Sequence, residues 1–298
     1  MQYAIAQVNR LGNRTYNQDR MGVVVRGDHL LLMVADGMGG HERGELAAQE
    51  LIVSMAAAFQ KEPLPIAVPQ RFLQQAMDRS HDNIVALGRR QEPPIYPRTT
   101  AAVVLVGGEV ACWAHIGDSR IYLIRDQEVA SRTRDHTYVE DLLRHNAITE
   151  EELATHPLRN IVTYCLGGPE RPPLATVSDP TPLAPGDVLL LCSDGFWGAL
   201  DPERIARELH DTDDLDATLA ALATAAEEAS YPYADNITAV VLRCLDEPGG
   251  QEAREDAGAL QPGEEEPTRP GDLAEVEEAI RTIREALRRY DPLPEGGK

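Results

Sequence analysis

The pattern of apolar and polar positions divides residues 1–245 into short apolar runs and longer segments of helical periodicity. The runs over residues 2–8 and 21–35 predict strands, and Gly27-Asp28 lies where a two-residue hairpin turn would divide the second run. Residues 30–35 are continuously apolar, which is typical of a strand covered on both faces. We therefore expect a hairpin whose second strand is fully buried.

Two long amphipathic helices are predicted after this hairpin. Residues 45–59 place small and apolar side chains on one helical face, and a second segment with the same property begins at Pro69. Proline suits the first turn of a helix, and Glu92-Pro93 ends the segment. Apolar runs then return at residues 101–106, 110–116 and 119–124, and we expect them to form an antiparallel meander.

The pattern is short and polar from Thr133 to Leu166, which indicates an inserted surface subdomain with a capping box at Thr149 and Glu152. Another strand is predicted at residues 187–192. A helix follows that begins at Asp201-Pro202, and a second helix is lined by apolar residues of 215–226. Residues 234–242 supply the last predicted strand.

The last part of the chain has a different character. Residues 246–271 are rich in Gly, Pro and Glu, and they predict a disordered acidic linker because they carry too few apolar side chains to form a core. Residues 272–290 carry apolar side chains at helical spacing and predict a C-terminal amphipathic helix. Three alternatives stay open: this helix mediates a contact with another protein, self-associates, or is too marginal to do either.

Composition and charge argue against some classes of function, namely nucleic-acid binding and membrane binding. The chain has 298 residues, of which 43% are hydrophobic, enough for a substantial core. A formal net charge of −21 disfavours nonspecific binding to nucleic acid or to anionic membranes. No apolar run approaches the ~20 residues of a membrane helix, and the first residues do not resemble a signal peptide. We expect a cytoplasmic protein with no nucleic-acid and no membrane partner.

The four cysteines, Cys112, Cys165, Cys192 and Cys244, are far apart and show no CxxC spacing. Three of them lie in apolar runs that predict strands. Reduced thiols in the core are therefore expected, in preference to a zinc site or disulfide bonds.

Four aspartates carry the candidate chemistry. Asp36, Asp118, Asp194 and Asp235 each lie at the end of a predicted strand and next to Gly or Asn, and an antiparallel sandwich could bring such ends together. Ligands that offer only oxygen favour Mg²⁺ or Mn²⁺ over zinc. Arg14 offers a planar fork suited to a phosphoryl group. The alternative is four unrelated turn aspartates, with Asp36 merely capping the helix that follows it.

These residues belong to an ordered set of motifs that resembles the metal-dependent PP2C (PPM) family of serine/threonine protein phosphatases, in its bacterial form. The motifs are Arg14 with Asn17-Gln18-Asp19, Val34-Ala35-Asp36-Gly37-Met38-Gly39-Gly40-His41, Gly117-Asp118-Ser119-Arg120, Asp135-His136, His156-Pro157-Leu158-Arg159-Asn160, Cys192-Ser193-Asp194-Gly195 and Asp235-Asn236-Ile237-Thr238. The resemblance covers residues 1–245. It implies an α+β fold, a four-layer α/β/β/α sandwich of two antiparallel sheets flanked by helix pairs, with residues 133–168 as the family's flap.

The resemblance also implies a set of metal ligands. Asp36 would bridge two Mn²⁺ or Mg²⁺ ions, the Gly37 carbonyl would complete one of them, and Asp194 and Asp235 would hold the other. Asp118 with Asp194 would hold a third, weaker metal. Each of these roles is an expectation carried over position by position.

Two further residues receive catalytic roles from the resemblance, and two positions depart from it. Arg14 would bind the substrate phosphate, and Asp19 would orient metal-bound water. Gln18 stands where many relatives carry a glutamate that reaches a metal through water, so one metal is expected to be held more weakly. Met38 occupies the position of a histidine proposed as general acid in eukaryotic relatives, so that role has no candidate here.

The function implied is Mg²⁺- or Mn²⁺-dependent hydrolysis of phosphoserine and phosphothreonine in phosphorylated proteins, opposing a bacterial serine/threonine kinase. A pseudophosphatase, which binds a phosphorylated partner without turnover, is the main alternative, and the presence of all four aspartates argues against it. A third hypothesis is an adaptor whose function lies in the terminal helix.

Overall fold

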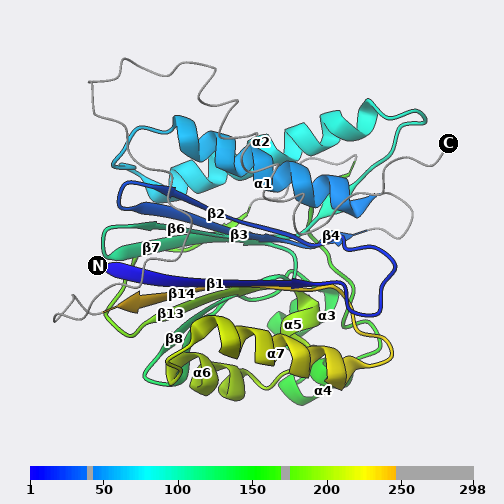
Figure 1. Ribbon diagram of the computed structural model, residues 1–298. Helices are drawn as coiled ribbons and strands as arrows, with labels where there is room; N and C mark the ends of the chain where they lie inside the picture. The colour runs from blue at the N-terminus through cyan, green and yellow to red at the C-terminus, as the bar shows by residue number, and fades with distance from the viewer. Residues whose placement is uncertain (39–42, 169–174, 246–298) are drawn as a thin grey trace.

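A computed structural model of the chain describes residues 1–38, 43–168 and 175–245. These residues form four layers, with helices on the outer face of each of two stacked antiparallel sheets (Figure 1). The expected α+β sandwich is confirmed. The predicted linker over residues 246–271, the predicted helix over residues 272–290 and His41 lie outside the described residues.

The first sheet has five strands, all paired antiparallel. In order across the sheet they are β1 (Gln2–Arg10), β14 (Ile237–Leu245), β13 (Val188–Cys192), β8 (Arg120–Arg125) and β9 (Glu128–Arg132). The first and last described strands are therefore neighbours, and the register pairs Gln2 with Leu245.

The second sheet has six strands and contains the predicted hairpin. Its strands are β11 (Thr176–Val177), β7 (Val110–Ile116), β6 (Ala101–Gly107), β3 (His29–Ala35) and β2 (Arg20–Arg26), with β12 (Thr181–Pro182) also paired with β7. A small three-stranded sheet of β10 (Leu166–Gly167), β5 (Arg98–Thr99) and β4 (Gly37–Met38) lies at one end of the sandwich.

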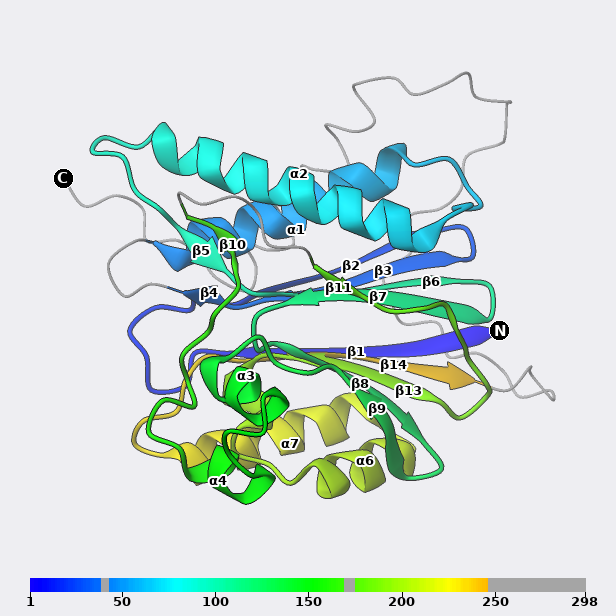
Figure 2. The same cartoon turned by 180° about the vertical axis from the view of Figure 1, so that it is seen from behind.

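Helices cover the outer faces of both sheets (Figures 1 and 2). The second sheet is covered by α1 (Gly44–Lys61) and α2 (Pro69–Arg89), and the first sheet by α5 (Asp194–Trp197), α6 (Pro202–His210) and α7 (Leu215–Ser230). The predicted N-termini of α2 and α6 are confirmed. Pro69 lies in the first turn of α2, and Asp201 caps α6 by accepting a hydrogen bond from the Glu203 amide.

Three apolar cores fill the spaces between the layers. In β3, Leu31 and Met33 face α1 and α2, whereas Leu32 faces the other sheet, and all seven residues of the strand are buried. A fully buried leucine contributes about 1.5–3 kcal/mol. Both faces of this strand are covered, which explains the continuous apolar run in an antiparallel sheet.

The expected meander over residues 101–124 is wrong in its third strand. β6 and β7 pair as predicted, but β8 pairs with β13 and β9 in the opposite sheet. The chain crosses from one sheet to the other at Gly117-Asp118-Ser119, where Gly117 has a φ of 96° and Thr100 packs against its Cα. This crossing places Asp118 between the two sheets.

Two smaller differences from the sequence predictions concern polar segments. The segment over residues 133–168 contains two short helices, α3 (Tyr138–Arg144) and α4 (Glu150–Thr155). The capping box of Thr149 and Glu152 opens α4 as predicted, whereas α3 was not predicted because it buries only Val139. The last strand begins at Ile237 rather than at residue 234.

The cysteines are free thiols, as expected, and three of them, Cys112, Cys192 and Cys244, are buried in strands. Among the described residues, no helix combines the length and the apolar character needed to cross a membrane.

Candidate metal centre

The four candidate aspartates come together at one end of the sandwich, although the chain delivers them from four separate elements. Asp36 follows β3, Asp118 lies between β7 and β8, Asp194 is the first residue of α5, and Asp235 precedes β14. Each of the other three, together with Asp19, is near enough for its negative charge to act on Asp36. The structure therefore groups these five carboxylates, while their roles as ligands stay predictions.

Close backbone packing fixes Asp36 and Gly37 in place. A Cβ atom on Gly37 would lie 2.4 Å from the backbone of Gly44 at the start of α1, so only glycine fits there. The Asp36 carbonyl accepts hydrogen bonds from the Thr100 amide (2.9 Å) and the Thr99 hydroxyl (2.9 Å). The two threonines thereby hold the backbone that presents the Asp36 carboxylate.

The electrostatics of the cluster are unfavourable without a cation. Removal of water by the surrounding protein, followed by repulsion between the carboxylates, raises the pKa of Asp19 to about 7, of Asp118 to about 8 and of Asp194 to about 6. The same causes raise the pKa of Asp36 well above its usual value. Asp19 and Asp118 are buried, whereas Asp36, Asp194 and Asp235 remain partly open to solvent. The concentrated negative charge is thus accessible from outside.

One buried carboxylate oxygen, Oδ1 of Asp194, has no hydrogen-bond partner among the described residues. Such an atom is costly to bury unless something else pairs with it. Both this orphaned oxygen and the oxygen-only donor set fit a hard divalent cation such as Mg²⁺ or Mn²⁺.

In the described part of the chain, no three His, Cys, Asp or Glu side chains are arranged closely enough to enclose one ion. A closed cage of side chains is the usual arrangement for structural zinc. Mg²⁺ commonly keeps several waters and takes only one or two carboxylates from the protein. The open arrangement therefore fits ions that share carboxylates and complete their shells with water.

Asp19 is buried, with 1% of its surface exposed. Its carboxylate accepts a hydrogen bond from the Ser193 hydroxyl (2.7 Å), and Ser193 in turn is bonded through its amide to the Thr238 carbonyl (3.0 Å). Asp19 is thereby fixed to β13 and β14, beside Asp194. Ser193 belongs to the motif Cys192-Ser193-Asp194-Gly195, but its anchoring role was not foreseen.

Arg14 lies at the mouth of the site and forms an ion pair with Asp235, with 2.5 Å between the guanidinium nitrogen and the carboxylate oxygen. The side chains of both residues are partly exposed, at 56% and 38% respectively. The Arg14 guanidinium is therefore paired with Asp235, which is one of the predicted metal ligands. A cation at Asp235 and this ion pair would compete for the same carboxylate.

Asn236 holds the loop that carries Arg14. Its side-chain amide donates to the carbonyls of Leu11 (2.9 Å) and Tyr16 (3.1 Å), and its side-chain oxygen accepts from the Gln18 amide (2.8 Å). Asn236 is buried. It was part of the Asp235-Asn236 motif in the sequence, but only the structure shows that it fastens the loop between β1 and β2 to the start of β14.

Arg120 holds the segment that carries Asp118 through contacts with Asp135 and Trp197. The Arg120 guanidinium forms a two-pronged salt bridge with Asp135 (2.8 Å for each contact) and lies 3.2 Å above the Trp197 ring. Trp197 donates from its indole nitrogen to the Asp118 carbonyl (3.0 Å). This chain of contacts ties the flap, the crossing segment and α5 together.

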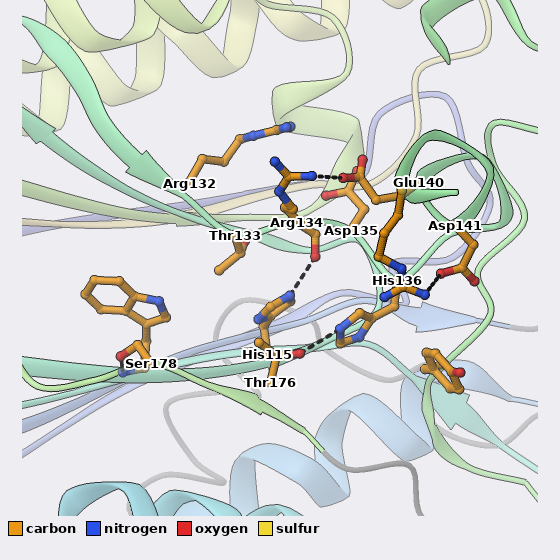
Figure 3. Close-up of a pocket in the computed structure, with 13 residues that line it drawn as sticks. His115, Arg132, Thr133, Arg134, Asp135, His136, Glu140, Asp141, Thr176 and Ser178 are labelled. Atoms are coloured by element: carbon orange, nitrogen blue, oxygen red, sulfur yellow. Dashed lines mark hydrogen bonds and ion pairs between the residues drawn. The ribbon is translucent and has the colours of Figure 1, made fainter. Parts of the chain in front are cut away.

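His136, near the start of the flap, makes a second contact with the segment that carries Asp118, and Figure 3 shows its ring beside that of His115. Its backbone amide donates to the Gly117 carbonyl (2.8 Å), and its ring stacks on His115, with 4.7 Å between centroids. Burial, and next the neighbouring His115 ring, lower the pKa of His136 to about 4, so the ring is neutral at pH 7. The cavity of about 680 Å³ that these rings line contains none of the predicted metal ligands.

Comparison with known proteins adds a family match. A family model described as protein phosphatase 2C matches residues 7–240. The serine/threonine protein phosphatase PstP of Mycobacterium tuberculosis is 32% identical over 280 residues, which cover 94% of this chain and 52% of PstP. The protein phosphatase PhpP of Streptococcus pneumoniae is 34% identical over 196 residues, 64% of this chain and 78% of PhpP. The chain thus spans about half the length of PstP.

Solved structures agree with the family match. The catalytic domain of the serine/threonine protein phosphatase PstP in complex with two manganese ions is similar to this chain, with a TM-score of 0.70 and 31% sequence identity. The similarity covers 82% of this chain and 99% of that one.

Proposed function

The chain belongs to the protein phosphatase 2C family, and we propose that it hydrolyses phosphoserine and phosphothreonine in proteins with the help of divalent metal ions. The observation that carries the proposal is the group of buried and half-buried carboxylates, with raised pKa values and an unpartnered oxygen on Asp194. Such a group is stabilised by bound cations, and the related PstP structure contains two manganese ions.

We propose the following ligand roles. Asp36 and the Gly37 carbonyl would hold one ion, Asp194 and Asp235 the other, with Asp36 shared, and Asp118 with Asp194 would hold a third, weaker ion. Bound Mn²⁺ or Mg²⁺ would supply positive charge for the phosphoryl group and make a water molecule more acidic. The protein would contribute the fixed positions of these ligands.

Two side chains would act directly on substrate and water. Arg14, at the mouth of the site, would leave Asp235 and grip the phosphoryl oxygens with its planar fork. Asp19, fixed by Ser193, would accept a hydrogen bond from the attacking water and orient it. Since Met38 carries no proton to give, the leaving oxygen would take its proton from water or from an unassigned group.

The substrates we propose are phosphorylated proteins made by a serine/threonine kinase in the same cell, and the cytoplasmic location stays a prediction. The pseudophosphatase alternative predicts binding without turnover. The presence of every predicted metal-ligating aspartate supports turnover.

The experiment is hydrolysis of a phosphothreonine peptide by the purified full chain, with Mn²⁺, with Mg²⁺ and with a chelator. We expect turnover that requires metal and that is lost in Asp36→Asn. Metal and phosphopeptide binding without turnover would support the pseudophosphatase instead, whereas turnover that is insensitive to the chelator would contradict the metal assignment.

A further inference from the structure

We propose that three tyrosines beside the candidate metal centre, Tyr16, Tyr231 and Tyr233, form a docking rim for the substrate polypeptide, and that the rim favours basic residues next to the phosphorylated one. The proposal rests on the proposed function, because it concerns the selection of substrates at that site.

The three tyrosines of the rim are unusually exposed to solvent. Tyr233 is 86% exposed, Tyr16 74% and Tyr231 73%, and no other large hydrophobic side chain in the described residues exceeds 59%. Aromatic residues make up only 5% of the chain. All three tyrosines lie in two loops, the one between β1 and β2 and the one between α7 and β14. Exposed tyrosines are enriched at protein-binding surfaces.

The two loops are fixed to each other. The Asn13 amide donates to the Ala234 carbonyl (2.9 Å), and the Ala234 amide donates to the Asn13 side chain (3.3 Å). The Tyr16 carbonyl accepts from Asn236, and the Tyr233 amide donates to the Ser230 carbonyl (2.8 Å). Both views of the fold show the loops side by side (Figures 1 and 2). A rim on fixed backbone loses little conformational freedom when it binds a partner.

The rim is continuous with the residues proposed to hold the phosphoryl group. Arg14 comes directly after Asn13, and Asp235 comes directly after Ala234, so the ion pair between them bridges the same two loops. A phosphoryl group held by Arg14 would leave the neighbouring residues of its polypeptide next to the tyrosines. A small aryl phosphate would not reach them.

The negative charge of the protein determines which residues next to the phosphorylated one the rim favours. The chain carries a net charge of −21, and Glu228, whose carbonyl accepts from the Tyr231 amide, is exposed beside the rim. The face of a tyrosine ring attracts Lys and Arg side chains. Acidic flanking residues would be repelled by this negative charge and by the exposed carboxylate of Glu228. The rim therefore suits a segment with Arg or Lys near the phosphorylated residue.

The test uses two phosphothreonine peptides that differ only in having Arg or Glu at the flanking positions, together with p-nitrophenyl phosphate, all with the full chain in Mn²⁺. We expect a higher kcat/KM for the Arg peptide. In the double variant Tyr231→Ala/Tyr233→Ala, kcat/KM for the Arg peptide should fall by a factor of roughly 5–30, since each exposed contact between a cation and a ring is worth a factor of about 2–5. Turnover of p-nitrophenyl phosphate should not change, which also shows that the variant is folded.

Two control variants sharpen the result. Tyr231→Phe/Tyr233→Phe keeps the rings and should keep the preference for Arg. Tyr96→Ala removes an exposed tyrosine from a different loop and should have no effect. A wild-type protein that hydrolyses p-nitrophenyl phosphate but treats both peptides alike, or a preference that survives in the double Ala variant, would overturn the proposal.

Failure of the proposed function would be visible separately, as absence of turnover with every substrate. In that case, fluorescence anisotropy of the two labelled phosphopeptides with the metal-loaded protein decides the matter. Tighter binding of the Arg peptide that is lost in Tyr231→Ala/Tyr233→Ala supports the rim, and equal binding of both peptides contradicts it.

Discussion

At the scale of single residues, the position of Arg14 links metal binding to substrate binding. Its guanidinium contacts Asp235, so the carboxylate is already partly neutralised in the absence of metal. Asp36 and Asp194 lie among like charges, and Asp194 has an oxygen without a partner. We infer that a metal ion satisfies these carboxylates and leaves the Arg14 fork available for phosphate.

Arg14→Lys tests this residue directly. Lysine keeps the positive charge but loses the planar fork, so we expect KM for a phosphopeptide to rise by roughly tenfold, the loss of about one charge-assisted hydrogen bond, with a smaller fall in kcat. Steady-state kinetics measure both quantities. Arg10→Lys, at a nearby arginine that pairs with Glu227, should change neither. A fall in kcat at constant KM would place Arg14 in transition-state stabilisation instead.

At the scale of elements, the site depends on hydrogen bonds that join the loops at the ends of different strands. Asn236 holds the loop between β1 and β2 by three hydrogen bonds. Asn236→Ala should lower the free energy of unfolding by about 1–3 kcal/mol, because buried polar groups lose their partners. It should also raise KM, because the loop carries Arg14. Chemical denaturation and kinetics check the two effects, and unchanged stability would show that the loop is held by other contacts.

The sequence predicted the elements better than it predicted their partners. The apolar run of β3 and the amphipathic α1 and α2 have strong periodic signals, and their ends were correct to within a few residues. The transfer of β8 to the other sheet was missed, because a short spacer of Gly117-Asp118-Ser119 suits a hairpin as well as a crossing. The partner of a strand that is buried on both faces is set by packing in three dimensions.

In the site, too, the residues were easier to predict from the sequence than the contacts between them. The aspartates could be found because carboxylates beside glycine or asparagine at strand ends form a visible pattern. The supporting contacts could not, because Ser193, Thr99 and Thr100 act on residues far away in the sequence. The ion pair of Arg14 with Asp235 joins positions separated by more than two hundred residues, and it too becomes visible only in the fold.

At the scale of the whole molecule, the carboxylates should make stability depend on pH and metal. Asp19 and Asp118 have pKa values of about 7 and 8, above those in the unfolded chain, so the folded protein binds more protons than the unfolded chain up to about pH 8. The metal-free protein should therefore lose stability as the pH rises from about 4, the pKa of an aspartate in the unfolded chain, to about 8. In the lower part of this range, up to about pH 6.5, the lowered pKa values of His115 and His136 act in the opposite direction.

Melting temperatures in the presence of a chelator, measured across this pH range, check the prediction. Asp118→Asn should flatten the decline, since it removes one of the titrating groups. Mn²⁺ should stabilise the protein more at pH 8 than at pH 6, because its ligands must be deprotonated. A melting temperature of the metal-free protein that rises steadily with pH would contradict the account.

Removal of residues 246–298 should leave turnover of a small aryl phosphate within about twofold of the full chain, an effect of less than about 0.5 kcal/mol. All predicted ligands lie before this segment, and the family match ends at residue 240. Any effect should concern binding of a partner protein or association, which light scattering would report. Loss of most turnover in a folded, metal-binding truncated protein would place part of the site beyond residue 245.

The central claim is that these aspartates bind divalent metal with Asp36 shared between two ions, and titration calorimetry with Mn²⁺ tests it most directly. Asp36→Asn removes a charge from both ions and should weaken the whole pair, whereas Asp118→Ala should lose only the third, weaker ion. We predict two ions retained in the Asp118 variant and a weakened pair in the Asp36 variant, both on folded protein. Abolished binding in Asp118→Ala together with normal binding in Asp36→Asn would contradict the account.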